Sequence, residues 1–390
     1  MPAKRGVMPQ DPTASSVVVI GGGVIGLSVA WRAAQHGHAV CVLERGELGA
    51  GASRVAAGML APVTEADAGE LALLELGLRS ARSWPAFAGE LAEASGADSG
   101  LHRCGTLVVA RDGDEAAALE RELALRVHLG LDVERVLPSA ARRLEPALAP
   151  TLRLALSVAG DHAADPRALL LALTEAARRA GAQLRTGTSV QSIRVEHGVV
   201  AGVELAGGEL VPAGQVVVAA GAWSGAIGGL PAGAAVPLRP VKGQILRLCD
   251  PQGAGLLERI VRFEGGYLVP RGDGRYVLGA TMEERGFDTT VTAGALYELL
   301  RDACELVPGV HELVLEEAAA GLRPATPDNA PVLGVADDVE GLVWATGHHR
   351  NGILLAPVTA DIVAGVLDGT PGPPAFAPGR FAPVPEEAAA

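Results

Sequence analysis

Runs of apolar residues that end in glycine mark the start of the chain as part of a buried sheet. Residues 17–20 (VVVI) are β-branched and precede three glycines, which is typical of a strand covered on both faces. Residues 24–35 carry apolar positions at helical spacing, and residues 39–43 (AVCVL) form a second apolar run. This strand–helix–strand order predicts the first unit of a doubly wound parallel sheet.

The same kind of pattern returns in the middle and at the end of the chain. Residues 167–195 predict a helix, a turn and a strand, and residues 215–225 (QVVVAAGAWSG) predict a buried strand that closes on a glycine turn. A strand at 342–345 and a helix at 354–367 are expected near the C-terminus, whereas short alternating stretches between 240 and 282 indicate an antiparallel sheet. Further helices are expected over 69–99, 115–130 and 294–306. We therefore expect two domains whose sequences interleave.

Composition and charge narrow the class of protein. Nearly half of the 390 residues are apolar and the formal net charge is −13, so we expect a globular protein that does not bind nucleic acid or an anionic membrane surface. No run of about 18 apolar residues occurs, so no membrane span is expected. Residues 1–15 and the proline-rich residues 371–390 are predicted to be flexible tails.

The cysteines point to a reducing environment. Cys41, Cys104, Cys249 and Cys304 lie far apart and show no CxxC spacing, which suits neither a zinc site nor a disulfide framework. Residues 1–15 also lack the apolar segment of a signal peptide. A cytoplasmic location is therefore expected.

A dinucleotide-binding fingerprint lies between the first strand and the first helix. Gly21 permits a tight turn, Gly23 lets the backbone approach a pyrophosphate, and Gly26 allows close packing of helix on strand. Glu44 ends the second strand, where a carboxylate accepts hydrogen bonds from ribose hydroxyls and disfavours the 2′-phosphate of NADP. The helix start, with Val24 and Ile25, offers free N–H groups to the phosphates. The fingerprint alone is shared by NAD and FAD proteins.

The stretch directly after the acid is expected to run beside an extended cofactor. Residues 44–62 (ERGELGAGASRVAAGMLAP) are rich in small residues, and Ser53 and Arg54 offer polar contacts to phosphate. A flexible surface loop is the alternative, but the Ala-Ala-Gly-Met-Leu run is too apolar for it. The expected contacts in this stretch are Arg45, Ser53, Arg54, Ala56, Ala57, Gly58 and Met59.

Several further motifs follow in a fixed order. They are SRVAAGMLAP (53–62), AAGAWS (219–224), RPVKGQ (239–244), GYLVPR (266–271), GATM (279–282), AGLRPATPDNAPVLG (320–334) and GHHRNGILLAP (347–357). Over residues 16–370 the chain thereby resembles the D-amino-acid-oxidase-like (DAO) family of FAD-dependent oxidoreductases, and most closely the glycine oxidases of thiamine biosynthesis. The VKGQ, GLRP and RNGILLAP elements are more specific to this family than the glycine fingerprint.

The resemblance implies a mixed fold, α/β plus α+β. A Rossmann-like FAD-binding domain would interleave with a substrate domain that contains a large antiparallel sheet. The resemblance and the strand pattern together predict the boundaries. The FAD-binding domain is expected at 16–85, 140–225 and 319–370, and the substrate-binding domain at 86–139 and 226–318.

The resemblance also implies the chemistry. A hydride would leave the α-carbon of glycine or a related small amino acid for flavin N5, and O2 would reoxidise the flavin to give hydrogen peroxide. The imine would be hydrolysed to a keto acid and ammonia or passed to a thiazole-forming step. Sarcosine and D-amino-acid oxidases, and a D-amino-acid dehydrogenase with another acceptor, are the alternatives. FAD is expected to be non-covalent because no cysteine lies in 305–390, and a homo-oligomer, in relatives often a tetramer, is expected.

Four side chains are expected around the substrate by resemblance. Arg323 in the GLRP motif would grip the substrate carboxylate with two parallel hydrogen bonds. Tyr267 would add a phenolic hydrogen bond, with an aromatic residue buried in the sheet as the alternative. Met282 would line the pocket or fill the core. Arg350 would reach the substrate carboxylate or the edge of the flavin.

Other positions are expected to contact FAD. Val190 resembles a backbone position that contacts adenine, and Trp223 would cover the nucleotide or, as we favour, fill the core. Lys242 would lie near the flavin or cross between domains as a structural lysine. The remaining expected contacts are Ala220, Gly221, Gly321, Arg323, His349, Arg350, Asn351, Gly352, Ile353 and Leu354.

The adjacent histidines at 348 and 349 raise the alternative of a metal site. Neighbouring side chains point in different directions and no second ligand cluster is evident, so no metal is expected. We expect a strand that ends at Ala345, a turn, and a helix entered near Asn351 and Gly352 whose N–H groups face the reduced flavin. His348 and His349 would flank this site without acting as acid or base.

The chain departs from the family pattern in two places. Ala319 stands before the AGLRP motif, where the family often has tryptophan. Gly265 and Gly266 precede Tyr267, where relatives carry larger side chains. Both changes are expected to widen or reshape the pocket, so glycine, sarcosine and small D-amino acids remain open as substrates.

Overall fold

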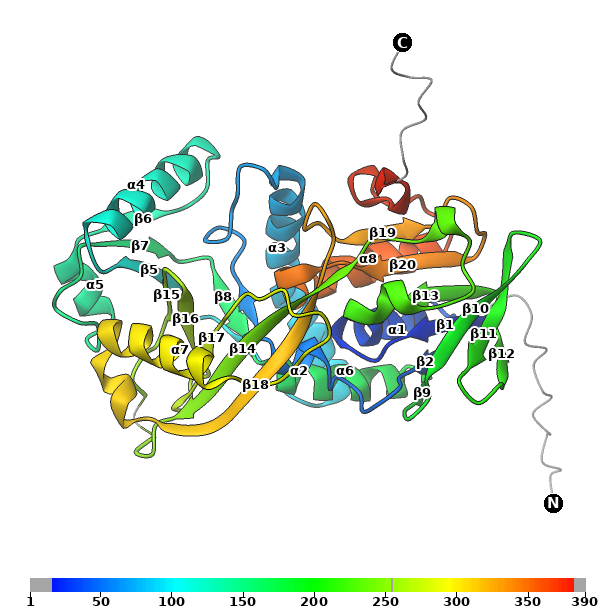
Figure 1. Ribbon diagram of the computed structural model, residues 1–390, viewed down its shortest axis with the longest axis horizontal. Helices are drawn as coiled ribbons and strands as arrows, with labels where there is room; N and C mark the ends of the chain where they lie inside the picture. Colours follow the sequence, from blue (N-terminus) through cyan, green and yellow to red (C-terminus); the bar gives the residue numbers. More distant parts are fainter. Residues whose placement is uncertain (1–15, 254, 382–390) are drawn as a thin grey trace, which may run out of the picture.

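Two large sheets lie side by side, and the chain passes between them several times (Figure 1). The computed structural model describes residues 16–253 and 255–381. The first sheet has six strands in the order β19-β20-β13-β1-β2-β9, and all neighbours are parallel except β19 and β20. Its strands are β1 (Ser16–Ile20), β2 (Ala39–Leu43), β9 (Gln183–Arg185), β13 (Gln215–Val218), β19 (Val332–Val335) and β20 (Leu342–Thr346).

The first strand is buried on both faces, as its continuous apolar sequence predicts. Val17 and Val19 pack into the core formed with the helices on one face, whereas Val18 and Ile20 pack on the opposite face. The helices on the first face are α1 (Val24–Gln35), α3 (Leu71–Ser95), α6 (Pro166–Arg179) and α8 (Ala356–Leu367). The opposite face is covered by a small sheet of β10 (Val190–Glu196), β11 (Val199–Leu205) and β12 (Leu210–Pro212).

The second large sheet has eight strands in the order β18-β14-β17-β16-β15-β5-β7-β6, and only the β15–β5 pair is parallel. Its strands are β5 (Thr106–Ala110), β6 (Glu134–Val136), β7 (Leu154–Val158), β14 (Arg239–Cys249), β15 (Ile260–Phe263), β16 (Gly266–Pro270), β17 (Arg275–Gly279) and β18 (Val314–Ala325). Its helices are α4 (Gly113–His128), α5 (Pro138–Leu144) and α7 (Ala293–Leu306). A short sheet joins β3 (Met59–Leu60), β8 (His162–Ala164) and β4 (Leu101–His102), and α2 (Ala52–Val55) precedes it.

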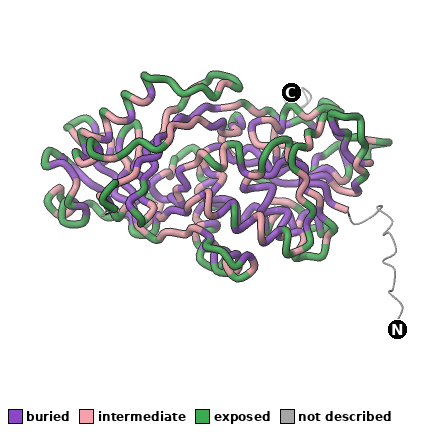
Figure 2. Tube along the Cα trace, turned by 90° about the horizontal axis from the view of Figure 1, so that it is seen from below, coloured by how far each residue is buried: buried purple, intermediate pink, exposed green. Residues whose placement is uncertain are grey.

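The predicted fold class and the interleaving of parallel and antiparallel regions are confirmed. Strands from the start, the middle and the end of the chain form the six-stranded sheet. The boundaries differ from the predicted ones in places. Strand β7 falls in the segment assigned to the FAD-binding domain but lies in the eight-stranded sheet, and α3 runs through the boundary at 85. Buried residues run through both halves of the molecule (Figure 2).

The C-terminal prediction was wrong for residues 371–381. This stretch forms two short 3-10 helices, Pro374–Phe376 and Pro378–Phe381, and the Phe376 ring is buried in the helical core. The Arg380 guanidinium forms an ion pair with Asp328 at 2.8 Å. A proline-rich sequence is therefore ordered here by packing on β19 and its neighbours. Residues 1–15 and 382–390 lie outside the described residues.

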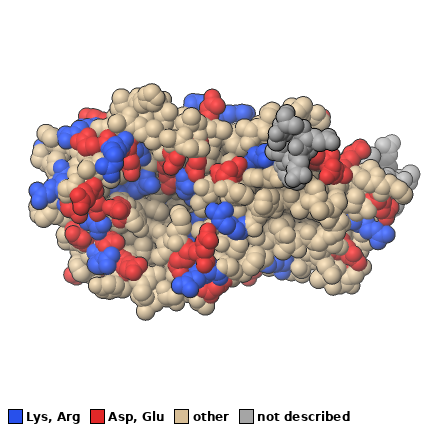
Figure 3. All heavy atoms as spheres, turned by 45° about the horizontal axis from the view of Figure 1, so that its top comes forward, with Lys and Arg blue, Asp and Glu red and all other residues tan. Residues whose placement is uncertain are grey.

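The visible face of the molecule in the space-filling view (Figure 3) carries both acidic and basic side chains among uncharged ones. Figure 3 shows both signs interspersed over one face, with no broad area of a single charge. Among the described helices, none combines the length and apolar character needed to cross a membrane.

The contact of α1 with the turn before it generates a stability prediction. A Cβ added at Gly26 would collide with the carbonyl oxygen of Gly21, so Gly26→Ala is expected to lower the free energy of unfolding by about 1–3 kcal/mol. Gly89, an exposed glycine in α3, has open space around it, and Gly89→Ala is expected to stabilise by about 0.5–1 kcal/mol. Urea unfolding of both variants measures the difference. Equal stability of the two would contradict the close helix–turn contact.

Candidate active site

A cavity of about 1520 Å³ lies where the parallel strands end. Ile20, Leu43, Ala219 and Thr346, which lie at the carboxyl ends of four strands or directly after them, line one side of it. The opposite side is a face of the eight-stranded sheet, with Ile245, Tyr267 and Arg323. Pockets for drug-sized ligands have roughly 300–1,000 Å³, so this cavity has room for a dinucleotide and a small substrate together. The carboxyl edge of a doubly wound sheet is also where such folds bind ligands.

The dinucleotide end of the cavity is held by hydrogen bonds to the glycine turn. The Gly22 N–H donates to Glu44 Oε2 at 2.8 Å, and the Gly46 N–H donates to Glu44 Oε1 at 2.9 Å. The Val24 N–H donates to Ser53 Oγ at 3.0 Å, which ties the start of α1 to the residue 53 segment. Gly21 has a φ of 106°, a conformation that favours glycine. The cradle thus presents backbone that a pyrophosphate could approach, and the Glu44 carboxylate stands beside it, where such folds place an acid for the ribose.

Trp223 lies at the edge of this cavity, and our expectation that it fills the core was wrong. The Arg45 guanidinium lies 3.8 Å from the centre of its ring, and the ring of Phe287 stacks on it at 5.6 Å and 30°. Trp223 is half-buried and lines the cavity. A residue after β2, one after β13 and one after β17 therefore meet beside the nucleotide end.

Arg323 offers an unpaired positive charge to the cavity. Its guanidinium lies over Gly243, where an added Cβ would be 2.5 Å from Nη1 and Nη2. Nη1 donates to the carbonyl oxygens of Thr281 at 3.1 Å and Lys242 at 3.4 Å, and no carboxylate pairs with Arg323 among the described residues. Burial raises the pKa of Tyr267, and the nearby Arg323 charge acts in the opposite direction. Tyr267 is therefore a neutral phenol beside a guanidinium that has room for a carboxylate.

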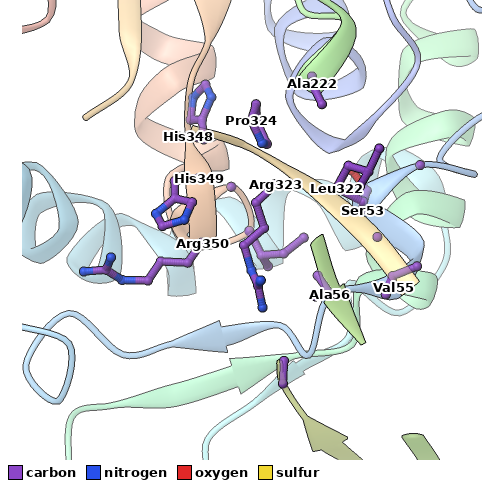
Figure 4. Close-up of a pocket in the computed structure, with 18 of the residues that line it drawn as sticks. Ser53, Val55, Ala56, Ala222, Leu322, Arg323, Pro324, His348, His349 and Arg350 are labelled. Atoms are coloured by element: carbon purple, nitrogen blue, oxygen red, sulfur yellow. The ribbon is translucent and has the colours of Figure 1, made fainter. Parts of the chain in front are cut away.

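Arg350 also lines the cavity, but its charge is already balanced. Its Nε lies 2.9 Å from Glu65 Oε2, and its Nη2 lies 2.8 Å from Glu70 Oε2. Figure 4 shows Arg323 and Arg350 projecting in different directions from neighbouring elements. Arg350 therefore ties the turn after β20 to residues 65–70, and of these two arginines Arg323 is the one left free for an anion.

Both histidines are buried and neutral. His348 Nε2 lies 3.0 Å from Thr359 Oγ1, and burial lowers the pKa of His348 to about 3. Burial lowers the pKa of His349 to about 3 as well, and the Arg350 charge adds to this effect. The turn differs from the expected helix entry. A 3-10 helix spans His349–Asn351, and α8 begins only at Ala356.

Most of the predicted cofactor and substrate positions meet at the cavity. Met282 lines it with 66% of its surface exposed, so it lies at the mouth and does not fill the core. The other predicted residues that line it are Gly21, Gly23, Val24, Ile25, Glu44, Arg45, Ser53, Ala56, Ala57, Gly58, Met59, Val190, Ala220, Gly221, Trp223, Tyr267, Gly321, Arg323, His349, Arg350, Gly352 and Ile353.

Four predicted cofactor contacts do not line the cavity. Gly26 packs against the turn, and the carbonyl of Arg54 accepts a hydrogen bond from Arg247 at 2.7 Å on the sheet side. Leu354 faces α3, where its carbonyl oxygen accepts from Ser80 and Trp84, and Asn351 lies on the same side. We predicted these contacts because the residues stand inside continuous motifs. Successive residues of a turn or helix point in different directions, so not every residue of such a motif can face the cavity.

Glu65 and Arg262 are among the charged cavity residues that sequence reasoning missed. Glu65, in the turn that follows β3, carries no pattern that marks it. Arg262 interrupts the apolar run IVRF of β15, and an arginine in such a strand is a signal that could have been used. Lys242 is the structural lysine: it is 1% exposed and its Nζ binds Asp288 Oδ2 at 2.7 Å.

The buried histidines predict how stability depends on pH. Their folded-state pKa of about 3 lies below the ordinary 6.5. The two neutral histidines therefore contribute fully to the free energy of unfolding above pH 6.5, and this contribution is lost as the pH falls towards 3. At pH 5 each histidine is expected to cost about 2 kcal/mol relative to pH 7. His348→Gln should remove about that much of the pH dependence in urea unfolding. The exposed control His311→Gln should leave it unchanged, and identical curves for His348→Gln and the unaltered protein would contradict the burial effect.

Comparison with known proteins places this arrangement in a family. The family described as "FAD dependent oxidoreductase" (DAO) matches residues 16–366. The glycine oxidase of Geobacillus kaustophilus is 36% identical over 355 residues, which cover 90% of this chain and 92% of that protein. The bifunctional protein ThiO/ThiG of Trichormus variabilis is 35% identical over 351 residues, which cover 89% of this chain and 52% of that protein.

Solved structures agree with these matches. The crystal structure of glycine oxidase from Geobacillus kaustophilus superposes with a TM-score of 0.87 at 34% identity, covering 94% of this chain and 99% of that one. Iminodiacetate oxidase from Chelativorans sp. BNC1 superposes with a TM-score of 0.83 at 31% identity, covering 93% and 98%. The glycine cradle, the Glu44 carboxylate and the size of the cavity fit FAD as the cofactor. The chain therefore belongs to the DAO family of FAD-dependent oxidoreductases.

Proposed function

We propose that this enzyme oxidises the α-carbon–nitrogen bond of glycine or a related small amino acid. The products are the keto acid, which is glyoxylate from glycine, with ammonia and hydrogen peroxide. When bound, FAD supplies the redox chemistry: it accepts a hydride from the substrate and passes the electrons to O2. The observation that carries the proposal is the unpaired guanidinium of Arg323 beside the neutral phenol of Tyr267.

The side chains around this point suit a bound amino acid. Arg323 would hold the substrate carboxylate with two parallel hydrogen bonds, and its contacts with Gly243 and the Thr281 carbonyl restrict its motion. The Tyr267 hydroxyl would donate to the same carboxylate. A histidine with a pKa of about 3 is too weak a base to take a proton from an ammonium group, so the amine would bind in its neutral form.

The finer identity of the substrate rests on resemblance. Glycine is supported by the relatives named glycine oxidase, and a role in thiazole formation for thiamine by the likeness to ThiO/ThiG. Sarcosine and small D-amino acids are the alternatives, as is a dehydrogenase that uses another acceptor. None of the four cysteines lines the cavity, which supports non-covalent FAD. A homo-oligomer, with a tetramer expected by resemblance, stays a prediction.

A peroxide-coupled assay tests the proposal. Purified yellow enzyme is given glycine, sarcosine, D-alanine, D-proline and L-alanine in air, and then a dye acceptor without oxygen. We expect peroxide from glycine or one of its small relatives. Dye reduction without peroxide would favour the dehydrogenase, and activity on L-alanine alone would contradict the proposed substrate class.

Arg323→Met tests the residue on which the proposal depends. The value of kcat/KM for glycine is expected to fall roughly 30-fold or more, since removing one partner of a buried charge pair costs about 2–5 kcal/mol. Methylamine, which has no carboxylate, should be oxidised equally slowly by both proteins. The control Arg275→Met removes an exposed arginine from the same sheet and should behave as the unaltered enzyme. Equal losses for glycine and methylamine would show that Arg323 does not read the carboxylate.

A further inference from the structure

A second arginine lies on the substrate side of the cavity, on the strand next to Tyr267. Arg262 of β15 is the antiparallel partner of Tyr267 on β16. Directly opposite residues of neighbouring strands project to the same face, with Cβ atoms about 4.5–5.5 Å apart. Both residues line the cavity. Arg262 therefore stands beside the tyrosine, on the side away from Arg323.

The three side chains form a row across the sheet. The Arg323 guanidinium reaches from β18 over Gly243 of β14. The Tyr267 hydroxyl reaches from β16 over Gly279 of β17, where an added Cβ would be 2.9 Å from its oxygen. The two arginines thus come from strands on opposite sides of the strand that carries the tyrosine.

Positive charge is in excess around Arg262. Its guanidinium donates to the carbonyl oxygen of Thr64, and it forms no ion pair with any carboxylate among the described residues. Arg126 shares this carbonyl at 2.6 Å and pairs with one carboxylate, Glu122, at 3.0 Å. Burial lowers the pKa of Arg126, and the Arg262 charge acts in the same direction.

Apart from Glu122, two acids close to this segment are engaged elsewhere. Glu65 is bound by Arg350, and the Asp161 carboxylate accepts the N–H groups of Val63 and Thr64. Burial raises the pKa of Asp161 to about 6. A ligand anion would therefore meet an arginine pair that the protein neutralises only in part.

The cavity extends beyond Tyr267 towards this pair. Gly265 has a φ of 85°, and the nearest atom to a Cβ added there is Asp302 Oδ2 at 3.7 Å. Gly266 leaves no such room, since its Cβ would lie 2.8 Å from the Phe263 ring. The cavity lining includes Gly265 and reaches Leu299 of α7 and Leu125 of α4.

We infer that the site accepts amino acids that carry a second anionic group, with the α-carboxylate on Arg323 and the second anion on Arg262. This inference rests on the proposed function. The second anion sits either on a substituent of the nitrogen, as in iminodiacetate, or on the side chain, as in D-aspartate. In both cases a C–H and an N–H bond give way to an imine, and O2 takes two electrons and two protons as hydrogen peroxide. Water then cleaves the imine, which gives a keto acid and ammonia from D-aspartate, and glyoxylate and glycine from iminodiacetate.

Matched substrate pairs test the inference. Iminodiacetate is compared with sarcosine, and D-aspartate with D-alanine, in the holoenzyme and in Arg262→Gln. We expect the unaltered enzyme to prefer at least one dicarboxylate to its matched monocarboxylate. Arg262→Gln should reduce that preference, measured as a ratio of kcat/KM values, by about tenfold or more, because a charge-assisted hydrogen bond is lost. The substrate pair whose preference changes shows whether Arg262 binds an anion on the nitrogen substituent or one on the side chain. The exposed Arg275→Gln serves as the control.

A binding measurement separates recognition from turnover. Glutarate and butyrate are titrated into the holoenzyme, and the change in flavin absorbance and the inhibition of sarcosine oxidation are followed. Glutarate should bind to the unaltered holoenzyme at least about tenfold more tightly than butyrate. This comparison needs no variant protein. Equal binding of the two acids, or an unchanged preference in Arg262→Gln, would overturn the inference. If the unaltered holoenzyme oxidises none of these amino acids, the proposed function is refuted instead. The two failures are therefore distinguishable.

Discussion

The structure depends on arginine side chains that donate to backbone carbonyls of one irregular segment. Residues 54–64 cross from the nucleotide turn to the eight-stranded sheet with little regular structure, so their carbonyl oxygens need partners from elsewhere. Arg247 donates to Arg54, Arg271 to Ala57 and Arg126 to Val63. Burial lowers the pKa of Arg247 to about 10, but the group stays charged at neutral pH. These bonds hold the cavity wall between the sheets.

The acceptors that surround an arginine also explain why Arg350 and Arg323, which both line the cavity, differ in whether they can bind a ligand anion. Arg350 faces Glu65 and Glu70, and its charge is balanced within the protein. The Arg323 guanidinium donates to two carbonyl oxygens, which hold it in place without neutralising it. An arginine oriented by neutral acceptors keeps its attraction for an anion. Neighbouring partners thus decide which arginine is structural and which is available to a ligand.

Local sequence predicted much of the fold because its patterns are local. The apolar run at residues 17–20 and the glycines after it specify a buried strand and a tight turn with short-range physics alone. The tail at residues 371–381 could not be predicted in this way. Its proline content suggests flexibility, but Phe376 finds a place in a core built by distant helices. The local patterns could not distinguish FAD from NAD as the cofactor, and the choice of FAD rested on the resemblance to the family.

The sequence by itself was enough to predict the strand–helix–strand order of the first unit, the glycine cradle and the carboxylate of Glu44. It also pointed to Arg323 as the arginine that would bind the substrate carboxylate. Only the tertiary structure decided which side chains meet. Trp223 lies between Arg45 and Phe287, and Arg262 stands beside Tyr267, because strand pairing joins segments that are far apart along the chain. The tertiary structure also balanced the charge of Arg350 and left that of Arg323 unpaired, since a charge is paired only when folding places its opposite within reach.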